Sequence, residues 1–202
     1  MALIDFIPSI LRKKLYRALY EFEIHDGSVN AIADDPDSYI QQGYTGNTSV
    51  YSIISRIDNM RKQAKLKLYR KLDGGGKEEI LNHELSLFTE KVNADTYTSD
   101  FITSHLIYLL TIGEFFVYKP QIQTGINKGK VSEIFELPSA DIDIIEGTMF
   151  DPVKGYKVEG NYNVMFDKNE VYHSKLFNPN AKDERSLHGL SPLRAASKTV
   201  SK

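Results

Sequence analysis

One stretch of the chain decides its fold class: Ser99-Asp-Phe-Ile-Thr-Ser-His-Leu-Ile-Tyr-Leu-Leu-Thr-Ile-Gly-Glu-Phe-Phe-Val-Tyr-Lys-Pro120. Its first half places large apolar residues at helical spacing, which predicts a helix from about Ser99 to Thr111. Gly113 follows and is the residue type that most often ends a helix. The second half, from Glu114 to Pro120, is rich in aromatic residues and is typical of a strand. A helix and a strand therefore follow each other directly here.

Short strands continue to about residue 175. The predicted strands, separated by turn-forming residues, are 115–120, 130–137, 141–146, 154–159, 162–166 and 170–176. Because short consecutive strands with tight turns pair antiparallel, we expect mainly antiparallel sheets. There is no alternation of strands and helices of the kind that builds a Rossmann-like fold. The predicted class is therefore α+β, with amphipathic helices packed on short strands.

The N-terminal third adds two predicted helices and a polar arm. The helices cover 3–22 and 49–63, and Asn47, Thr48 or Ser49 can cap the second. The segment 23–48 between them is polar and is expected to be a loop or arm with one short helical turn from Asp37 to Gln42. From Ala64 to Arg70 apolar and polar side chains alternate, as in a half-buried strand, and Gly74-Gly75-Gly76 ends it.

The C-terminal end predicts one more helix. Residues 178–188 are a polar loop, after which Ser191 has the position of an N-cap and Pro192 that of a first helical residue. No glycine or other C-terminal capping signal occurs before Lys202. We therefore expect residues 191–202 to be the start of a truncated helix.

Composition narrows the function classes. The 202 residues carry a net charge of −2 and include no cysteine. Disulfides, thiolate zinc sites and a cysteine nucleophile are thereby excluded. No apolar run reaches the roughly 20 residues that span a bilayer, so no membrane partner is expected. The net charge gives no global electrostatic case for binding nucleic acid.

The sequence contains no catalytic motif, so we expect no catalytic residue, no metal site and no cofactor. Gly189-Leu-Ser-Pro-Leu193 lacks the second glycine of a nucleophile elbow, and Pro192 removes an amide that an oxyanion hole needs. The five histidines lack metal-binding spacing. An enzyme alternative would use Asp141, Asp143 and His173. A solvated strand face explains the two aspartates better.

A run of basic residues is the one local electrostatic feature. Its members, with no acid between them, are Arg61, Lys62, Lys65, Lys67, Arg70 and Lys71. The run fits a module that contacts nucleic-acid phosphates. It also fits a solvated sheet face that discourages edge pairing, which the net acidity of the chain favours.

The order of these segments resembles a known family. Its motifs are Val50-Tyr-Ser-Ile-Ile-Ser-Arg-Ile57, Ala64-Lys-Leu-Lys-Leu-Tyr-Arg70, Gly113-Glu-Phe-Phe-Val-Tyr118, Leu137-Pro-Ser-Ala-Asp-Ile142, Glu170-Val-Tyr-His-Ser-Lys175 and His188-Gly-Leu-Ser-Pro-Leu193. From about residue 45 to the end they are similar to the N-terminal half of tailed-bacteriophage portal proteins. Residues 1–44 have no counterpart in the family. The local match over 73–98 is poor, because the Pro-Asn pair that this family often carries after the first strand is missing there. The helical spacing over 3–22 and the polar segment after it predict an N-terminal helix and arm over 1–44. The resemblance implies a wing-like domain over 45–190 and a stem-directed helix from 191.

The resemblance also implies a function. Portal proteins form rings, commonly of twelve subunits, at one capsid vertex of the virion, and DNA passes through the ring. The expected partners are other copies of this chain, the major capsid protein, the terminase large subunit, head-completion or adaptor proteins and double-stranded DNA. The protein would be made in the cytoplasm of the bacterial host. As subunit contacts we expect Phe115, Phe116, Leu176 and Phe177. A small adaptor that binds one protein partner is the remaining alternative.

Overall fold

The computed structural model describes all residues except 1–31, 33, 82, 161–163, 180–186 and 201–202. The helix predicted over 3–22 lies outside the described residues. The helices among the described residues are α2 (Pro36–Ser38), the π-helix η2 (Tyr39–Thr45), α3 (Thr48–Lys62), α4 (Glu84–Leu87), α5 (Thr98–Thr111), the short 3-10 helix η3 (Ser139–Asp141) and α6 (Pro192–Val200). None of the described helices is long and apolar enough to cross a bilayer.

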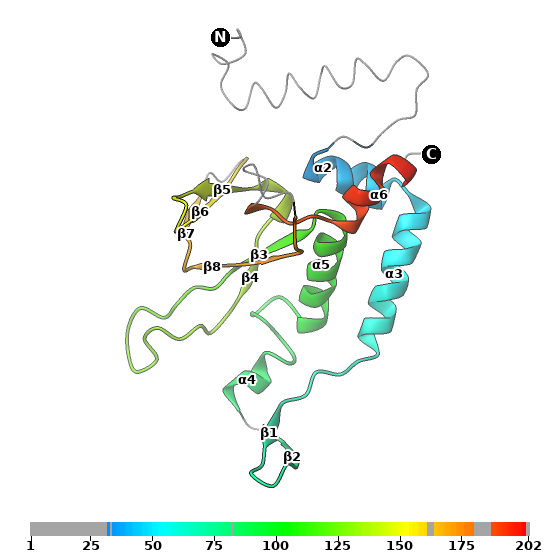
Figure 1. Cartoon of the computed structure of the whole chain (residues 1–202). Coiled ribbons are helices and arrows are strands. Elements are labelled where there is room, and N and C mark those ends of the chain that lie inside the picture. Colours follow the sequence, from blue (N-terminus) through cyan, green and yellow to red (C-terminus); the bar gives the residue numbers. More distant parts are fainter. Residues whose placement is uncertain (1–31, 33, 82, 161–163, 180–186, 201–202) are drawn as a thin grey trace, which may run out of the picture.

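The strands form three small antiparallel sheets within the described part of the chain (Figure 1). A hairpin joins β1 (Tyr69–Lys71) and β2 (Lys77–Glu79), and a second sheet has the order β4 (Phe135–Glu136), β3 (Glu114–Tyr118), β8 (Val171–Lys175). The third sheet joins β5 (Ile142–Glu146), β6 (Val153–Val158) and β7 (Met165–Asp167) in chain order. The α+β class and the antiparallel pairing are confirmed.

The predicted helices over 49–63 and 99–111 are confirmed. Asn47 is the cap of α3, since its Oδ1 accepts hydrogen bonds from the backbone nitrogens of Ser49 and Val50 at 3.0 and 3.1 Å. A cap of this kind satisfies amide groups that have no partner inside the helix. α5 ends just before Gly113, whose φ of 91° no longer fits a right-handed helix.

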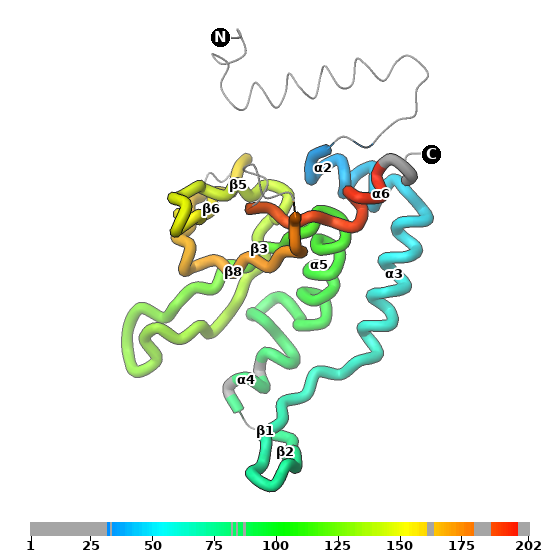
Figure 2. The backbone as a smooth tube through the Cα atoms, in the orientation of Figure 1, coloured from blue at the N-terminus to red at the C-terminus, as the bar shows by residue number. Residues whose placement is uncertain are grey.

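Two sequence predictions need correction. The segment 23–48 is not simply a polar arm with one turn, because helical residues run from Pro36 to Thr45 and bury Tyr39 and Gly43. The strand predicted from Ala64 shrinks to Tyr69–Lys71. Alternation of apolar and polar side chains predicts an extended backbone, but a strand also needs a hydrogen-bonded partner. Pairing with β2 covers only Tyr69–Lys71. In Figure 2 the chain runs from α3 through this extended segment to the β1–β2 hairpin, far from the other sheets.

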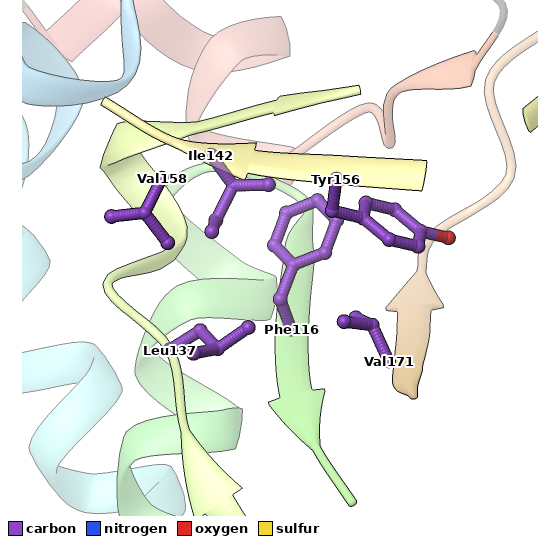
Figure 3. Close-up of a cluster of buried hydrophobic side chains, with 6 residues drawn as sticks. All are labelled: Phe116, Leu137, Ile142, Tyr156, Val158 and Val171. Carbon is purple, nitrogen blue, oxygen red and sulfur yellow. The ribbon is translucent and has the colours of Figure 1, made fainter. Parts of the chain in front are cut away.

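The larger apolar core lies between the two three-stranded sheets (Figure 3). It consists of Phe116, Leu137, Ile142, Tyr156, Val158 and Val171. The rings of Phe116 and Tyr156 meet edge to face, with centroids 5.5 Å apart. This geometry is favourable for aromatic pairs. Side-chain packing therefore holds β3 of one sheet against β6 of the other.

A second, smaller core joins helical segments that are distant in sequence. Its buried members are Ile32, Tyr39, Ile112 and Leu193. A methyl group on Gly43 would come 2.6 Å from Leu193 Cδ2, so glycine lets η2 approach α6 closely. Tyr39 also donates a hydrogen bond through its hydroxyl to Asp34 Oδ1 at 2.9 Å, while Arg194 Nη2 donates to Asp34 Oδ2 at 2.7 Å. The N-terminal and C-terminal described segments are thereby fastened together.

The tightest backbone approach joins Gly113 to the segment before α6. A Cβ on Gly113 would lie 2.6 Å from the Ser191 nitrogen, and one on Gly189 would lie 2.0 Å from the Gly113 oxygen. The Gly113 carbonyl also accepts a hydrogen bond from the Leu176 nitrogen at 2.8 Å. Glycine at 113 and 189 therefore lets three segments cross at one point.

We predict that Gly113→Ala destabilises the fold more than its backbone conformation alone requires. Gly129→Ala is the matched control, since Gly129 has a φ of 84° but no atom lies within 4 Å of the position that its Cβ would take. The control should cost about 1 kcal/mol for the left-handed conformation. Gly113→Ala should cost at least about 2 kcal/mol, because the crossing must open as well. Urea unfolding of both variants measures this, and equal losses would contradict the crossing argument.

Candidate functional site

Glu114 is a buried carboxylate at the start of β3, with a side chain 6% exposed. Its Oε2 accepts hydrogen bonds from His173 Nε2 at 2.9 Å and from the Gly189 backbone nitrogen at 3.2 Å. Its Oε1 accepts from His188 Nδ1 at 2.8 Å. An ionised carboxylate only accepts, so both facing ring nitrogens carry protons. One side chain thus joins β3, β8 and the segment that leads into α6.

The environment of Glu114 fixes its charge. Burial raises the pKa of this carboxyl group, but the hydrogen bonds and charges of His173 and His188 outweigh burial and lower the pKa to about 2. Glu114 is therefore ionised at neutral pH. The His173 ring also stacks on Phe116, with centroids 4.2 Å apart, so the polar group is continuous with the apolar core.

The segment after His188 begins α6 as the sequence predicts. The Oγ of Ser191 accepts a hydrogen bond from the Arg194 nitrogen at 2.9 Å, which makes Ser191 the N-cap. Pro192 is the first helical residue, and Leu193 is buried in the smaller core. Each position of Gly189-Leu-Ser-Pro-Leu193 except Leu190 therefore has a structural role. The serine is engaged as a cap and not as a nucleophile.

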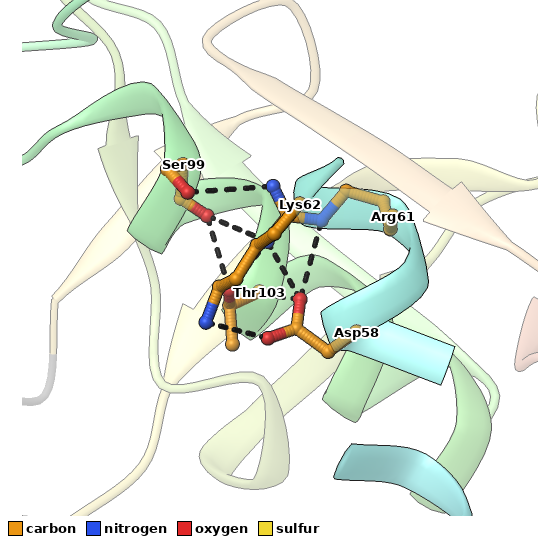
Figure 4. Close-up of polar contacts among 5 residues, drawn as sticks. All are labelled: Asp58, Arg61, Lys62, Ser99 and Thr103. Atoms are coloured by element: carbon orange, nitrogen blue, oxygen red, sulfur yellow. Dashed lines mark hydrogen bonds and ion pairs between the residues drawn. The ribbon is translucent and has the colours of Figure 1, made fainter. Parts of the chain in front are cut away.

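A second polar cluster joins α3 to α5 (Figure 4). The buried carboxylate of Asp58 pairs with Arg61 through Nη2 at 2.6 Å and with Lys62 through Nζ at 2.7 Å. Thr103 of α5 donates to Asp58 Oδ1 at 3.0 Å, and Arg61 Nη2 donates to the carbonyl oxygen of Ser99 at 3.1 Å. Burial raises the pKa of Asp58, but the hydrogen bonds from Lys62, Arg61 and Thr103 outweigh burial and lower it. The cluster holds one end of α3 against α5.

The members of the predicted basic run have different partners in the structure. Arg61 and Lys62 belong to the Asp58 cluster, and Lys67 pairs with Glu79 at 2.9 Å. Arg70 lies opposite Glu78 in the β1–β2 ladder. Lys65 and Lys71 are exposed, and Lys71 lies opposite Lys77. Acids from distant positions therefore interrupt the run in space, and DNA contact by these residues stays a prediction.

The predicted subunit contacts divide into buried and exposed residues. Phe115 and Phe116 are 1% and 0% exposed, so they are core residues and have no surface to offer a neighbouring subunit. This corrects the sequence prediction, which could not distinguish a buried central strand from an exposed one. Leu176 is partly buried, whereas Phe177 is 84% exposed. Phe177 remains a candidate contact.

The enzyme alternative finds no support in the arrangement of its residues. The Nε2 of His173 is engaged by Glu114 and not by either aspartate. Asp141 lies in the short 3-10 helix η3 (Ser139–Asp141), ahead of the strand that carries Asp143. Burial, followed by the nearby charge of Asp37, raises the pKa of Asp141. Within the described residues, no three histidine, aspartate or glutamate side chains are placed to hold a metal ion.

α3 is less buried than its sequence pattern suggests. Among its large apolar residues, Ile54 is buried, but Ile53, Ile57 and Met60 are 61%, 40% and 65% exposed. These three residues recur at helical spacing and form a stripe on the outer side of α3. A soluble monomer rarely leaves such a stripe uncovered, so the stripe points to an assembly surface.

Residues 48–202 match the family model described as phage portal protein. The chain belongs to the phage portal protein family. The match covers most of the chain and begins close to residue 45, where the motif resemblance starts. Glu114 and its three donors, His173, His188 and the Gly189 amide, form what we call the node around Glu114. This node and the cap of α6 are therefore features of a portal chain. No curated protein sequence matches this portal chain.

Solved structures share the fold. The chain is similar to a chain in the neck of an empty gene transfer agent (GTA) particle computed with C6 symmetry, with a TM-score of 0.63 and 20% identity over 89% of this chain and 45% of that one. A chain of the native gene transfer agent virion gives 0.62 and 19% over 91% and 46%. A neck computed with C12 symmetry gives 0.62 and 18% over 88% and 44%. The portal chain thus spans about half the length of these chains.

Sequence reasoning did not find the two polar nodes of this portal chain. Glu114 stands as a single acid within an apolar segment, which is the available signal for a buried, paired carboxylate. Asp58 has the polar neighbours Asn59 and Arg61 and gives no such signal. The signal does not name the partners, because His188 and Thr103 come from 74 and 45 residues away.

We predict an acid-sensitive contribution of Glu114 to stability. Its pKa is lower in the folded chain than its ordinary value of 4.5, so the unfolded chain binds the proton more tightly. The contribution is complete above pH 4.5 and is lost as the pH falls toward 2. From that shift it is worth about 3 kcal/mol.

Denaturant unfolding as a function of pH tests this contribution. Glu114→Gln should lower the free energy of unfolding by about 3 kcal/mol at neutral pH, because the two histidines lose their anionic acceptor. It should also flatten the acid limb, which is the part of the stability curve below pH 4.5 where the free energy of unfolding falls with pH. Glu78→Gln, at an exposed carboxylate of β2, is the matched control and should keep the limb. An unchanged limb in Glu114→Gln would show that the node does not determine acid stability.

We also predict that Asp58→Asn loosens α3 from α5. Arg61 and Lys62 lose a charged partner at a buried position, and the expected loss of stability is about 2 kcal/mol. Hydrogen exchange should increase in the C-terminal half of α3 more than in β3. Asp95→Asn, at an exposed loop position, is the control. An equal increase in hydrogen exchange in α3 and β3 would contradict the role of Asp58 in holding α3 against α5.

Proposed function

We propose that this chain is a structural subunit of the portal ring at the capsid vertex of a phage-like virion. The observation that carries the proposal is the match of residues 48–202 to the portal family. The likeness in fold to a chain in a particle neck computed with C12 symmetry supports assembly into a ring. The ring would form the channel for genome packaging and ejection.

The proposed partners follow from that position. The ring would contact the major capsid protein at the vertex, the terminase large subunit during packaging and head-completion or adaptor proteins afterwards. Double-stranded DNA would pass through its channel. The subunit itself would be non-enzymatic and would need no cofactor, because its role is mechanical. The protein would be made in the host cytoplasm and reside in the virion.

The proposed division of the chain has three parts. Residues 1–44 would form the N-terminal helix and a connecting segment, which is helical and packed from Pro36 onward. Residues 45–190 would form the wing-like domain and 191–202 the beginning of a stem-directed helix. The node around Glu114 supports the last boundary, since it fixes the start of α6 to β3 and β8. A rigid joint of this kind suits a subunit whose stem must keep one direction relative to its wing.

Native mass spectrometry with negative-stain electron microscopy tests the proposal. We expect a closed ring of about a dozen copies with an axial hole, as the family resemblance implies for the subunit number. A monomer or dimer without a hole would contradict the ring. Tight DNA binding by such a species, falling steeply with salt, would then favour a nucleic-acid-binding module. A defined complex with one protein partner would favour an adaptor.

A further inference from the structure

A hydrogen-bonded turn presents two large apolar side chains to solvent. Met149 and Phe150 lie in the turn between β5 and β6 and are 91% and 94% exposed. Hydrogen bonds close the turn from Gly147 N to Pro152 O at 2.9 Å and from Thr148 N to Asp151 O at 2.8 Å. Turns of this kind normally carry polar or small residues at their tip. We call Met149 and Phe150 the apolar knob.

The opposite edge of the chain presents the apolar stripe of α3, formed by Ile53, Ile57 and Met60. In Figure 1, α3 forms one lateral edge of the molecule, and the sheet of β5, β6 and β7 forms the other. The knob and the stripe therefore cannot cover each other within one chain. Two copies side by side could bring the knob of one against the stripe of the next.

The two edges also carry opposite charge. Residues 48–68, which comprise α3 and the extended segment after it, include five basic and one acidic side chain, a net charge of +4. Residues 141–170, which comprise the β5–β7 sheet and its turns, include seven acidic and three basic side chains, a net charge of −4. Surfaces of opposite sign attract and orient one another during association. Each edge thus complements the other in charge as well as in apolar surface.

We propose that the apolar knob of one subunit docks on the α3 stripe of the next copy of this chain, in a head-to-tail contact. The inference rests on the proposed ring and names the two surfaces that join its subunits. A contact between different surfaces propagates from copy to copy and gives a ring when its rotation closes, whereas a contact of like surfaces stops at a dimer. Like edges would also repel, because each has one dominant sign of charge.

The contact gives the basic residues of this edge a role other than DNA binding. Arg56 is exposed on α3, and Lys65 is exposed just after the end of this helix. They would face the acidic turns of the neighbouring β5–β7 sheet. Lys65, one member of the basic run predicted to contact phosphates, would then act between protein subunits. Lys67 already pairs with Glu79, and Arg70 lies opposite Glu78.

Cysteine cross-linking of the full chain tests the contact, because the chain has no cysteine of its own. The variants are Ile53→Cys on the stripe, Phe150→Cys on the knob and the double variant, each treated with a flexible bis-maleimide after assembly. The double variant should give a ladder of covalent multimers that extends to the whole ring. A co-assembled mixture of the two single variants should give linked dimers, and each single variant alone should stay monomeric on denaturing gels.

A matched control replaces the stripe cysteine with Asp73→Cys, in the exposed β1–β2 turn. Paired with Phe150→Cys, it should give no ladder. Rings that are visible by native mass spectrometry but give no ladder with Ile53→Cys would overturn the head-to-tail contact and leave the proposed function standing. Absence of rings in the unmodified protein would overturn both.

Two further outcomes identify other occupants of the stripe. Covalent dimers of Ile53→Cys alone would show that like surfaces meet, which overturns the proposal. A cysteine at 53 that stays unlinked and unreactive toward maleimide in rings would show that another segment, such as residues 3–22, covers the stripe, which overturns it as well. As a second readout, Phe150→Ser should abolish assembly into rings with an unchanged melting temperature of the subunit. The reason is that the removed aromatic side chain is almost fully exposed in the single chain.

Discussion

The ionised carboxylate of Glu114 is the constraint on which the rest of the structure depends. Once it is buried, it must be surrounded by donors, since an unpaired charge in the interior costs several kcal/mol. The donors come from β8 and from the segment before α6, so satisfying the charge brings these segments to the start of β3. The crossing at Gly113 and Gly189 lies beside it and leaves no room for side chains. Charge and close approach together fix where α6 begins.

Around this point the chain builds two small cores instead of one large core. One lies between the sheets and the other joins the helical segments 36–45, α5 and α6. α3 reaches the body through Ile54, Val50 and the Asp58 cluster, while much of its apolar face stays exposed. A chain organised in this way leaves apolar surface that its own fold does not bury. Its exposed edges are more useful in contact with other copies, as the proposed ring requires.

The motif Gly189-Leu-Ser-Pro-Leu193 illustrates how family identity and physical chemistry coincide. Gly189 allows the close approach, Ser191 caps the helix, Pro192 begins it and Leu193 is buried, so only Leu190 has no assigned role. The same residues first suggest a broken nucleophile elbow, and the structure assigns them to a helix start. A motif that contributes to the portal resemblance thus forms the joint between the sheet region and α6.

Local patterns by themselves determined much about this protein. Helical spacing and caps located α3, α5 and the start of α6, and turn residues located β3, β5, β6 and β8, because these signals act between residues a few positions apart. The strand predicted over 130–137 is limited to Phe135–Glu136. The order of the motifs was sufficient to indicate the portal family. Only the tertiary structure decided that Phe115 and Phe116 are core, that Pro36–Thr45 is a packed helical segment and that the basic run is divided by acids. It alone also revealed the partners of Glu114 and Asp58. These outcomes depend on contacts between residues tens to more than a hundred positions apart, and no local pattern carries the desolvation and pairing that select them.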